Sequence, residues 1–237
     1  MGGAGDGFKT NDEAGAVVIF EDCRAWYCSD DGFDPSGPNT VVISGCWSFD
    51  NGRLDGDGTG FKTGAVTVDN TGFISRTINN CIAATNRDRG FMLLEYPDYF
   101  RTNARFYNNN SFRNNNGFTI SNNALHPEVL AVWKNNISYM DNAVFSNAYQ
   151  EYTESNNTWD RVDGFPGYVP ASGINVTNDD FLSLDMDELK KPRKPEGSLP
   201  DINFMKLSQQ SDLIDKGINV GLPFLGISPD IGAIEIK

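Results

Sequence analysis

The chain has 237 residues, with 32 acidic against 19 basic residues and a formal net charge of −13. This balance disfavours nucleic acid as a partner, because phosphate binding needs a basic surface. No apolar run reaches the roughly 18 residues of a membrane-spanning helix, so we expect no membrane span.

Gly-Phe pairs recur in the first half of the chain, and five of them follow one another at intervals of 25 to 30 residues. These five are Gly7-Phe8, Gly32-Phe33, Gly60-Phe61, Gly90-Phe91 and Gly117-Phe118. Short β-branched runs such as Val17 to Phe20 and Val41 to Ile43 lie between them. A repeat of this length is typical of a solenoid, in which each unit buries its apolar face against its neighbours. We therefore predict stacked parallel β coils from residue 4 to about 157, with the five phenylalanines in one inner column.

Cysteines and asparagines recur at the predicted turns of these coils. Cys23, Cys46 and Cys81 each follow a Gly-Phe pair at a similar distance, which favours a buried ladder of free thiols over a disulfide. Zinc is not indicated, since neither a C-x-x-C pair nor a partner histidine is present. Asparagine tolerates left-handed backbone geometry, so we expect asparagine-rich turns such as 108–110 and 114–116 to hydrogen-bond along the stack.

The regular pattern ends near Trp159. We predict one unit of parallel β-helix over residues 1–159 and an irregular C-terminal extension over 160–237, packed along or across the solenoid. Such a segment protects an open coil end. The basic run from Lys190 to Lys194 is expected to be a solvated loop, and His126, the single histidine, a loop residue.

Three aspartates crowd into five residues: Asp30, Asp31 and Asp34. When the repeats are aligned on their Gly-Phe pairs, Asp6 lies over Asp31, about 4.8 Å away in a parallel stack. Like charges this close repel, and a hard dication held by carboxylate oxygens relieves the repulsion. The four aspartates therefore predict a calcium site, although Asp-Gly sequences are also common in ordinary turns.

Lysines and arginines fall in the same columns. Lys62 lies one coil beyond Asp34 and is our candidate for a general base. Lys9 lies in the same column; it is the rival for this role and otherwise a candidate for binding substrate. Arg87 and Arg89 belong to the next coil and are candidates for gripping a substrate carboxylate, or for a structural pairing with Asp88.

The residues around these positions resemble polysaccharide lyase family 9, the right-handed parallel β-helix pectate lyases. The resemblance rests on segments 5–9, 29–34, 56–62 and 86–91, and continues at 180–185, 197–200 and 228–233. It implies an all-β fold, calcium held by Asp6, Asp30, Asp31 and Asp34, and Lys62 as the base. The chain looks like such a protein without its N-terminal coils, and Met92 stands where a more polar residue is expected.

The reaction that the resemblance implies is β-elimination on an acidic polysaccharide such as polygalacturonate. We expect the protein to be a monomer. We also expect it to be secreted, periplasmic or at the cell surface, although no signal is visible in this chain. One alternative is a β-helix hydrolase of the polygalacturonase type, although its Gly-His-Gly and Arg-x-Lys motifs are absent here. Another is a non-catalytic β-helix module that binds polysaccharide or stiffens a surface protein.

Overall fold

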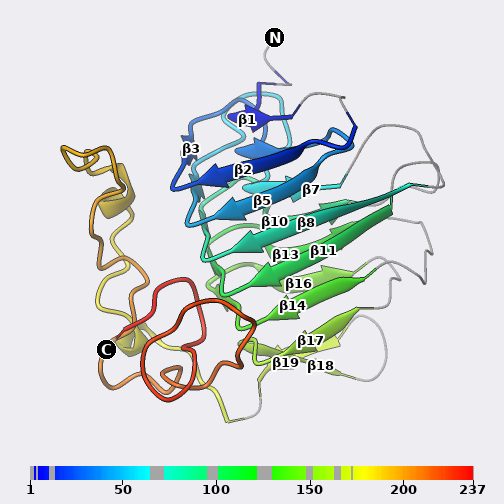
Figure 1. The fold of residues 1–237 in the computed structure, drawn as a ribbon. Coiled ribbons are helices and arrows are strands. Elements are labelled where there is room, and N and C mark those ends of the chain that lie inside the picture. Colours follow the sequence, from blue (N-terminus) through cyan, green and yellow to red (C-terminus); the bar gives the residue numbers. More distant parts are fainter. Residues whose placement is uncertain are drawn as a thin grey trace.

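Three parallel β-sheets wind around one axis (Figure 1). The computed structural model describes residues 3, 5–10, 14–64, 72–94, 101–121, 130–147, 152–162, 167–171 and 173–236. In every sheet each strand pairs in parallel with the equivalent strand of the adjacent coil. The predicted all-β parallel β-helix is therefore confirmed, and the described residues contain no α-helix.

The strands divide among the sheets by position in the coil. Sheet A contains β1 (Phe8–Lys9), β4 (Phe33–Asp34), β7 (Phe61–Thr63), β10 (Arg89–Leu94), β13 (Asn116–Ser121) and β16 (Ala143–Asn147). Sheet B contains β2 (Val17–Glu21), β5 (Thr40–Ser44), β8 (Phe73–Asn79), β11 (Arg101–Tyr107), β14 (Ala131–Lys134) and β17 (Thr153–Ser155). Sheet C contains β3 (Arg24–Trp26), β6 (Trp47–Phe49), β9 (Ile82–Ala84), β12 (Asn110–Phe112) and β15 (Ile137–Tyr139).

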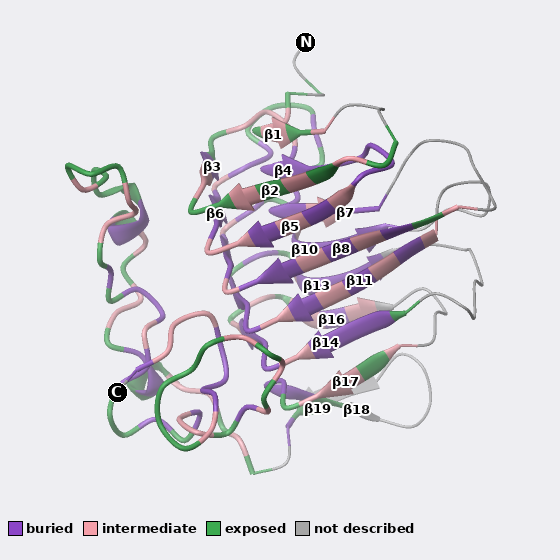
Figure 2. Cartoon of the chain, in the orientation of Figure 1, coloured by how far each residue is buried: buried purple, intermediate pink, exposed green. Residues whose placement is uncertain are grey.

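The inner face of sheet A carries the predicted phenylalanine column. Its strand register aligns Phe8, Phe33, Phe61, Phe91 and Phe118, and neighbouring rings stack with centroids 4.7 to 5.0 Å apart. Buried and half-buried residues also alternate along β11 of sheet B (Figure 2), as expected where successive side chains point to opposite faces. Four of these five rings are fully buried, and the residue that follows each of them along the strand points to the outer face of sheet A.

Two ladders of side chains fill the turns beside the core. In the turn between sheets B and C, Cys46 Sγ accepts a hydrogen bond from Cys23 N, and Asn109, Asn136 and Asn157 continue the column. All four cysteines are free, as predicted. In the turn between sheets C and A, the side chains of Asn51, Asn86, Asn114 and Asp141 each accept from the backbone amide of the preceding coil. The expected hydrogen bonding of asparagines along the stack is confirmed.

The coils end at an antiparallel hairpin of β18 (Trp159–Val162) and β19 (Gly167–Pro170). Trp159 packs against Phe118 and Phe145, with ring centroids 4.8 and 5.7 Å apart. The domain boundary at residue 159 stays a prediction.

Residues 173–236 then run alongside the solenoid, with the short 3-10 helices η1 (Asn178–Asp180) and η2 (Met186–Lys190) (Figure 1). We call this segment the extension. It forms a second apolar core on the outer face of sheet C, where Phe204 packs edge-on against Phe112 at 5.3 Å.

Two smaller expectations concern the basic run and the histidine. The basic run is exposed but held by specific contacts: Lys194 pairs with Asp201, and Arg193 donates to the carbonyl oxygen of Asp22.

His126 lies outside the described residues. Among the residues that the structure describes, none belongs to a helix with the length and apolar character needed to cross a membrane.

Candidate functional site

The candidate site lies on the outer face of sheet A, at β1, β4 and β7. Strand alternation turns Phe33 inward and the next residue, Asp34, outward, and Lys9 is the direct partner of Asp34 in the register. Lys62 follows Phe61 on the adjacent strand, so it occupies the same outward column. Asp6 and Asp31 precede the glycines of their coils and border this column.

Three carboxylates gather at this point. One oxygen from each of Asp6, Asp31 and Asp34 lies within 4.8 Å of the others. Asp31 is fully buried and Asp34 nearly so. Burial raises the pKa of Asp31 to about 6 and raises that of Asp34, because desolvation penalises the charged form. Backbone amides hold the cluster in place: Asp31 N donates to Asp6 Oδ1, and Thr59 N to Asp31 Oδ1. We call these three residues the acidic triad.

Two lysines neutralise the acidic triad. Lys62 Nζ lies 2.9 Å from Asp31 Oδ2, and Lys9 Nζ lies 3.1 and 3.4 Å from Asp6 and Asp34. The side chain of Lys62 is 18% exposed and that of Lys9 is 54% exposed. Burial alone would lower the pKa of the Lys62 ammonium, but the carboxylates of Asp31 and Asp34 outweigh burial and raise it. Lys62 is therefore the more enclosed cation.

The carboxylate of Asp30 is bonded to the adjoining loop and is not one of the three gathered carboxylates. Its Oδ1 accepts a hydrogen bond of 2.6 Å from Asp57 N. A Cβ at Gly56 would lie 2.5 Å from the Asp30 side chain, so only glycine fits there. Arg87 holds this loop by donating to the carbonyl oxygens of Leu54 and Gly56. Of the four predicted metal ligands, the structure brings together three, and Asp30 is bonded to the adjoining loop instead.

The two candidate arginines make contacts within the protein. Arg87 donates to the backbone of the loop next to Asp30, and Arg89 donates to the carboxylate of Asp88. Next in the outward column after Lys62 is Met92, which is buried. The substrate-binding roles of Arg87, Arg89 and Lys9 stay predictions.

Sequence reasoning did not single out Arg76, which supports the site from inside. Arg76 lies in β8 in register with the inward Val41, and its side chain is fully buried. Its Nη2 donates to the carbonyl oxygens of Pro35 and Gly37, at 2.9 and 2.6 Å. These bonds fix the segment that directly follows Asp34. The signal in the sequence is an arginine at an inward position of a strand.

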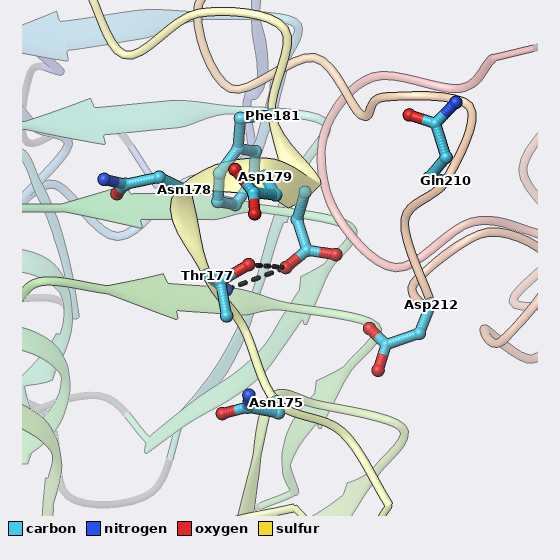
Figure 3. Close-up of a pocket in the computed structure, with 8 residues that line it drawn as sticks. Asn175, Thr177, Asn178, Asp179, Phe181, Gln210 and Asp212 are labelled. Carbon is cyan, nitrogen blue, oxygen red and sulfur yellow. Dashed lines mark hydrogen bonds between the residues drawn. The ribbon is translucent and has the colours of Figure 1, made fainter.

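A separate cavity of about 690 Å³ lies in the extension (Figure 3). Its lining includes the carboxylates of Asp179 and Asp212 and the amides of Asn175, Asn178 and Gln210, with no basic side chain. An anionic lining repels a polyanion, and none of the predicted site residues borders this cavity. The acidic triad therefore stays the candidate site.

The triad fits a hard dication. Calcium takes carboxylate oxygens at about 2.3–2.6 Å, and two oxygens on one ion then lie at most about 5 Å apart. The mutual separations in the triad, within 4.8 Å, satisfy this limit without movement of the backbone. Acidic groups can also cluster without a metal, but here two of the three are buried, where their repulsion is least screened.

Comparison with known proteins identifies the family of this chain. Residues 1–157 match the family described as "Pel9A-like, right handed beta helix region". The chain is 30% identical over 243 aligned residues to "Pectate lyase L" of Dickeya dadantii (strain 3937), covering 99% of this chain and 52% of that protein. A protein of the same description from Paenibacillus polymyxa (strain SC2) is 28% identical, covering 91% of this chain and 46% of the relative. The chain thus spans about half the length of these relatives.

Two solved structures share the fold. The first, "Crystal structure of pectate lyase Pel9A", gives a TM-score of 0.71 at 27% identity and covers 100% of this chain and 55% of its own. The second, "Rhamnogalacturonan lyase", gives a TM-score of 0.64 at 28% identity, over 86% of this chain and 52% of its own. The resemblance to the family 9 lyases is thereby confirmed, and the chain belongs to the Pel9A-like right-handed β-helix family, homologous to pectate lyase L.

Proposed function

We propose that this protein is a calcium-dependent polysaccharide lyase that cleaves polygalacturonate by β-elimination. One observation carries the proposal: a lysine amine stands 2.9 Å from a buried carboxylate of a triad whose geometry suits calcium. Homology to pectate lyases supports the same reaction class.

Asp6, Asp31 and Asp34 would hold the ion, and Asp30 would join them after leaving the amide of Asp57. When bound, calcium supplies positive charge that acidifies the proton next to a substrate carboxylate and competes with Lys62 for Asp31. Lys62 then has a neutral amine available, since its ammonium depends on Asp31 and Asp34 for stabilisation.

Lys62 acts as the general base in this proposal. Its amine accepts the proton from C5 of the uronate, the C5 electron pair forms a double bond to C4, and the C4–O bond breaks. The glycosidic oxygen leaves with the electron pair of the broken C4–O bond and takes a proton from solvent. The products are a new chain end and a C4–C5 unsaturated uronate, and no water is consumed. Arg76 keeps Asp34 in place during this reaction by holding the segment that follows it.

The test is ultraviolet absorbance of the unsaturated product from polygalacturonate with added calcium. We expect absorbance to rise with the wild type, to stop on chelation of calcium, and to be absent with a neutral polymer such as dextran. New reducing ends without ultraviolet absorbance would indicate the hydrolase alternative. Binding of polygalacturonate without either product would indicate the non-catalytic module.

The preferred uronate is tested with the same assay. A panel of polygalacturonate, alginate and rhamnogalacturonan reports which backbone gives the fastest absorbance change. We expect polygalacturonate to lead over rhamnogalacturonan, because every sugar of its backbone carries a carboxylate, and over alginate, because the relatives are described as pectate lyases. Because an acidic polysaccharide of this kind lies outside the cell, we also propose that the protein acts there, either secreted or at the cell surface. We propose that it acts as a monomer.

A further inference from the structure

Two columns of residues with left-handed backbone conformation run along the solenoid. The first follows the sheet B strands and contains Asp22, Gly45, Asn80, Asn108, Asn135 and Asn156, with φ between 49° and 63°. The second follows the sheet C strands and contains Tyr27, Asp50, Thr85, Arg113 and Met140, with φ between 51° and 59°. We call them the B–C column and the C–A column.

The two columns differ in the cost of their residues. Aspartate, asparagine and glycine adopt positive φ most readily, and every member of the B–C column is one of them. Tyrosine, threonine, arginine and methionine are unfavourable there, yet four of the five residues in the C–A column are of these types. A side chain kept at a strained position often makes a contact of its own. The question is which contact each one makes.

Neighbouring groups account for two of the four strained side chains. Thr85 donates a hydrogen bond of 2.9 Å to Asp50, and the Tyr27 ring lies 4.3 Å beneath the guanidinium of Arg53. Met140 is exposed and no described contact explains it. Arg113 is exposed, and its guanidinium lies 4.8 Å above the ring of Phe112. Its side chain has no ion pair or hydrogen bond to any described residue, and Tyr139 is the titratable group on which its charge acts, together with the charges of Asp179 and Asp180.

Arg113 is also the last of three arginines at the same turn of successive coils. Arg53 pairs with Asp50 at 3.6 Å, and Arg87 is committed to the backbone of the loop next to Asp30. Arg113 precedes strand β13 by three residues, and β13 is two strands from the β7 strand that carries Lys62. Two strand spacings place this turn about 10 Å along the axis from Lys62.

We propose that Arg113 binds a carboxylate of the acidic polysaccharide outside the acidic triad. A guanidinium over a ring face keeps the N–H groups in its plane available for a bidentate contact with a carboxylate. On a chain of net charge −13, an arginine without an acidic partner is a favourable local site for a polyanion. The inference rests on the proposed function, which supplies the polysaccharide, and it makes Arg113 a determinant of affinity rather than of the chemical step.

The test is retardation in non-denaturing gels that contain polygalacturonate and a chelator, so that binding is measured without turnover. Arg113→Asn removes the charge and suits positive φ, so we expect unchanged or higher thermal stability and about tenfold weaker retardation. Arg113→Lys should keep part of the retardation. Met140→Asn is the matched control, because it relieves the same strain without changing charge, and it should bind as the wild type does.

A second control separates charge from packing. Arg113→Met still covers Phe112 without a charge, so it should bind as weakly as Arg113→Asn. Highly methyl-esterified pectin and dextran should retard none of these proteins. Wild-type retardation of Arg113→Met, or of Arg113→Asn, would overturn the inference, as would a wild type that polygalacturonate does not retard.

The outcome is independent of the lyase assay. If the wild type yields no unsaturated product but retardation still depends on Arg113, the proposed function fails and this inference stands. If product forms while all variants bind equally, this inference fails alone.

Discussion

The outer faces of sheets A and C belong to the same coils but carry opposite chemistry. Sheet C presents Trp47, Phe49 and Phe112, which are buried beneath the extension. Sheet A presents Asp34 and Lys62, polar groups whose burial costs free energy unless they are paired. The backbone pattern is the same on both faces, so the side chains alone make the difference.

We infer that the outer face of sheet C contributes mainly to stability and the outer face of sheet A mainly to function. Apolar burial on sheet C stabilises the fold by about 25 cal/mol for each Å² removed from water. The acidic triad opposes folding through desolvation and repulsion, and such local conflicts are expected at functional sites. Substitutions on the two faces should therefore affect different measurements.

The largest effect is expected from Lys62→Ala. Loss of a general base typically slows a reaction about 10²- to 10⁴-fold, and we expect this loss in the ultraviolet assay with polygalacturonate. Lys62→Arg should fail as well, because arginine stays protonated. Lys9→Ala is the matched change at the more exposed lysine of the triad and should keep most of the turnover. An inactive Lys9→Ala beside an active Lys62→Ala would reverse the assignment of the base.

On the sheet C side, Phe204→Ala should lower stability instead. Phe204 is fully buried against Phe112, and removal of such a ring costs about 3–5 kcal/mol of unfolding free energy. Urea denaturation followed by fluorescence measures this loss. The specific activity of the folded fraction should be unchanged. A large fall in activity at full folding would show that the two faces are not separable.

Calcium should stabilise the protein through sheet A. An ion that binds only the folded state adds about 2.7 kcal/mol at one hundred times its dissociation constant. We expect a calcium-dependent rise in melting temperature that disappears in Asp31→Asn. Asp57→Asn is the control, because Asp57 contacts Asp30 only through its backbone amide. Equal shifts in Asp31→Asn and the wild type would place the calcium elsewhere.

The smallest effect concerns Asp141, at the end of the second turn ladder. Burial raises its pKa to about 6, so between pH 4 and 6 the native state holds a proton that the unfolded chain has lost. Its contribution to stability therefore falls as pH rises through this window and stays low above it. Asp141→Asn continues the asparagine ladder without a charge and should be more stable than the wild type at pH 8. We expect a gain smaller than the roughly 3 kcal/mol that the whole pKa difference represents, because the Ser138 hydroxyl loses a carboxylate acceptor.

The control for this prediction is the pH dependence itself. The advantage of Asp141→Asn in urea denaturation should shrink below pH 6 and approach zero near pH 3, where the wild-type carboxyl is largely protonated in both states. An advantage that stays constant from pH 4 to 8 would rule out titration of Asp141 as its cause.

Periodic features of the fold could be predicted from the sequence. The phenylalanine column follows from the recurring Gly-Phe pairs, and the approach of Asp6 to Asp31 follows from the same alignment. Phe145 escaped prediction because it follows Val144, although it continues the column beside Phe118. A stacked position requires the phenylalanine but tolerates some variation at the residue before it.

Aperiodic features could not be predicted. The path of the extension over sheet C depends on contacts between residues about a hundred positions apart, such as Phe112 and Phe204, and no spacing encodes them. The turn of Asp30 toward Asp57 depends on a single backbone amide in the adjoining loop. The C–A column contains no asparagine or glycine, the residues from which the turn positions of the B–C column can be predicted.

The extension has a consequence for the order in which this protein folds. Its hydrogen bonds connect the first coil, through Arg24 and Leu189, to the last, through Asn156 and Lys216. Synthesis proceeds from the N-terminus at about 5–20 residues per second, so Trp47 emerges on the order of ten seconds before Phe204. During that interval the apolar outer face of sheet C has no cover from its own chain. The growing chain must therefore remain soluble with an apolar face exposed until its last quarter is made.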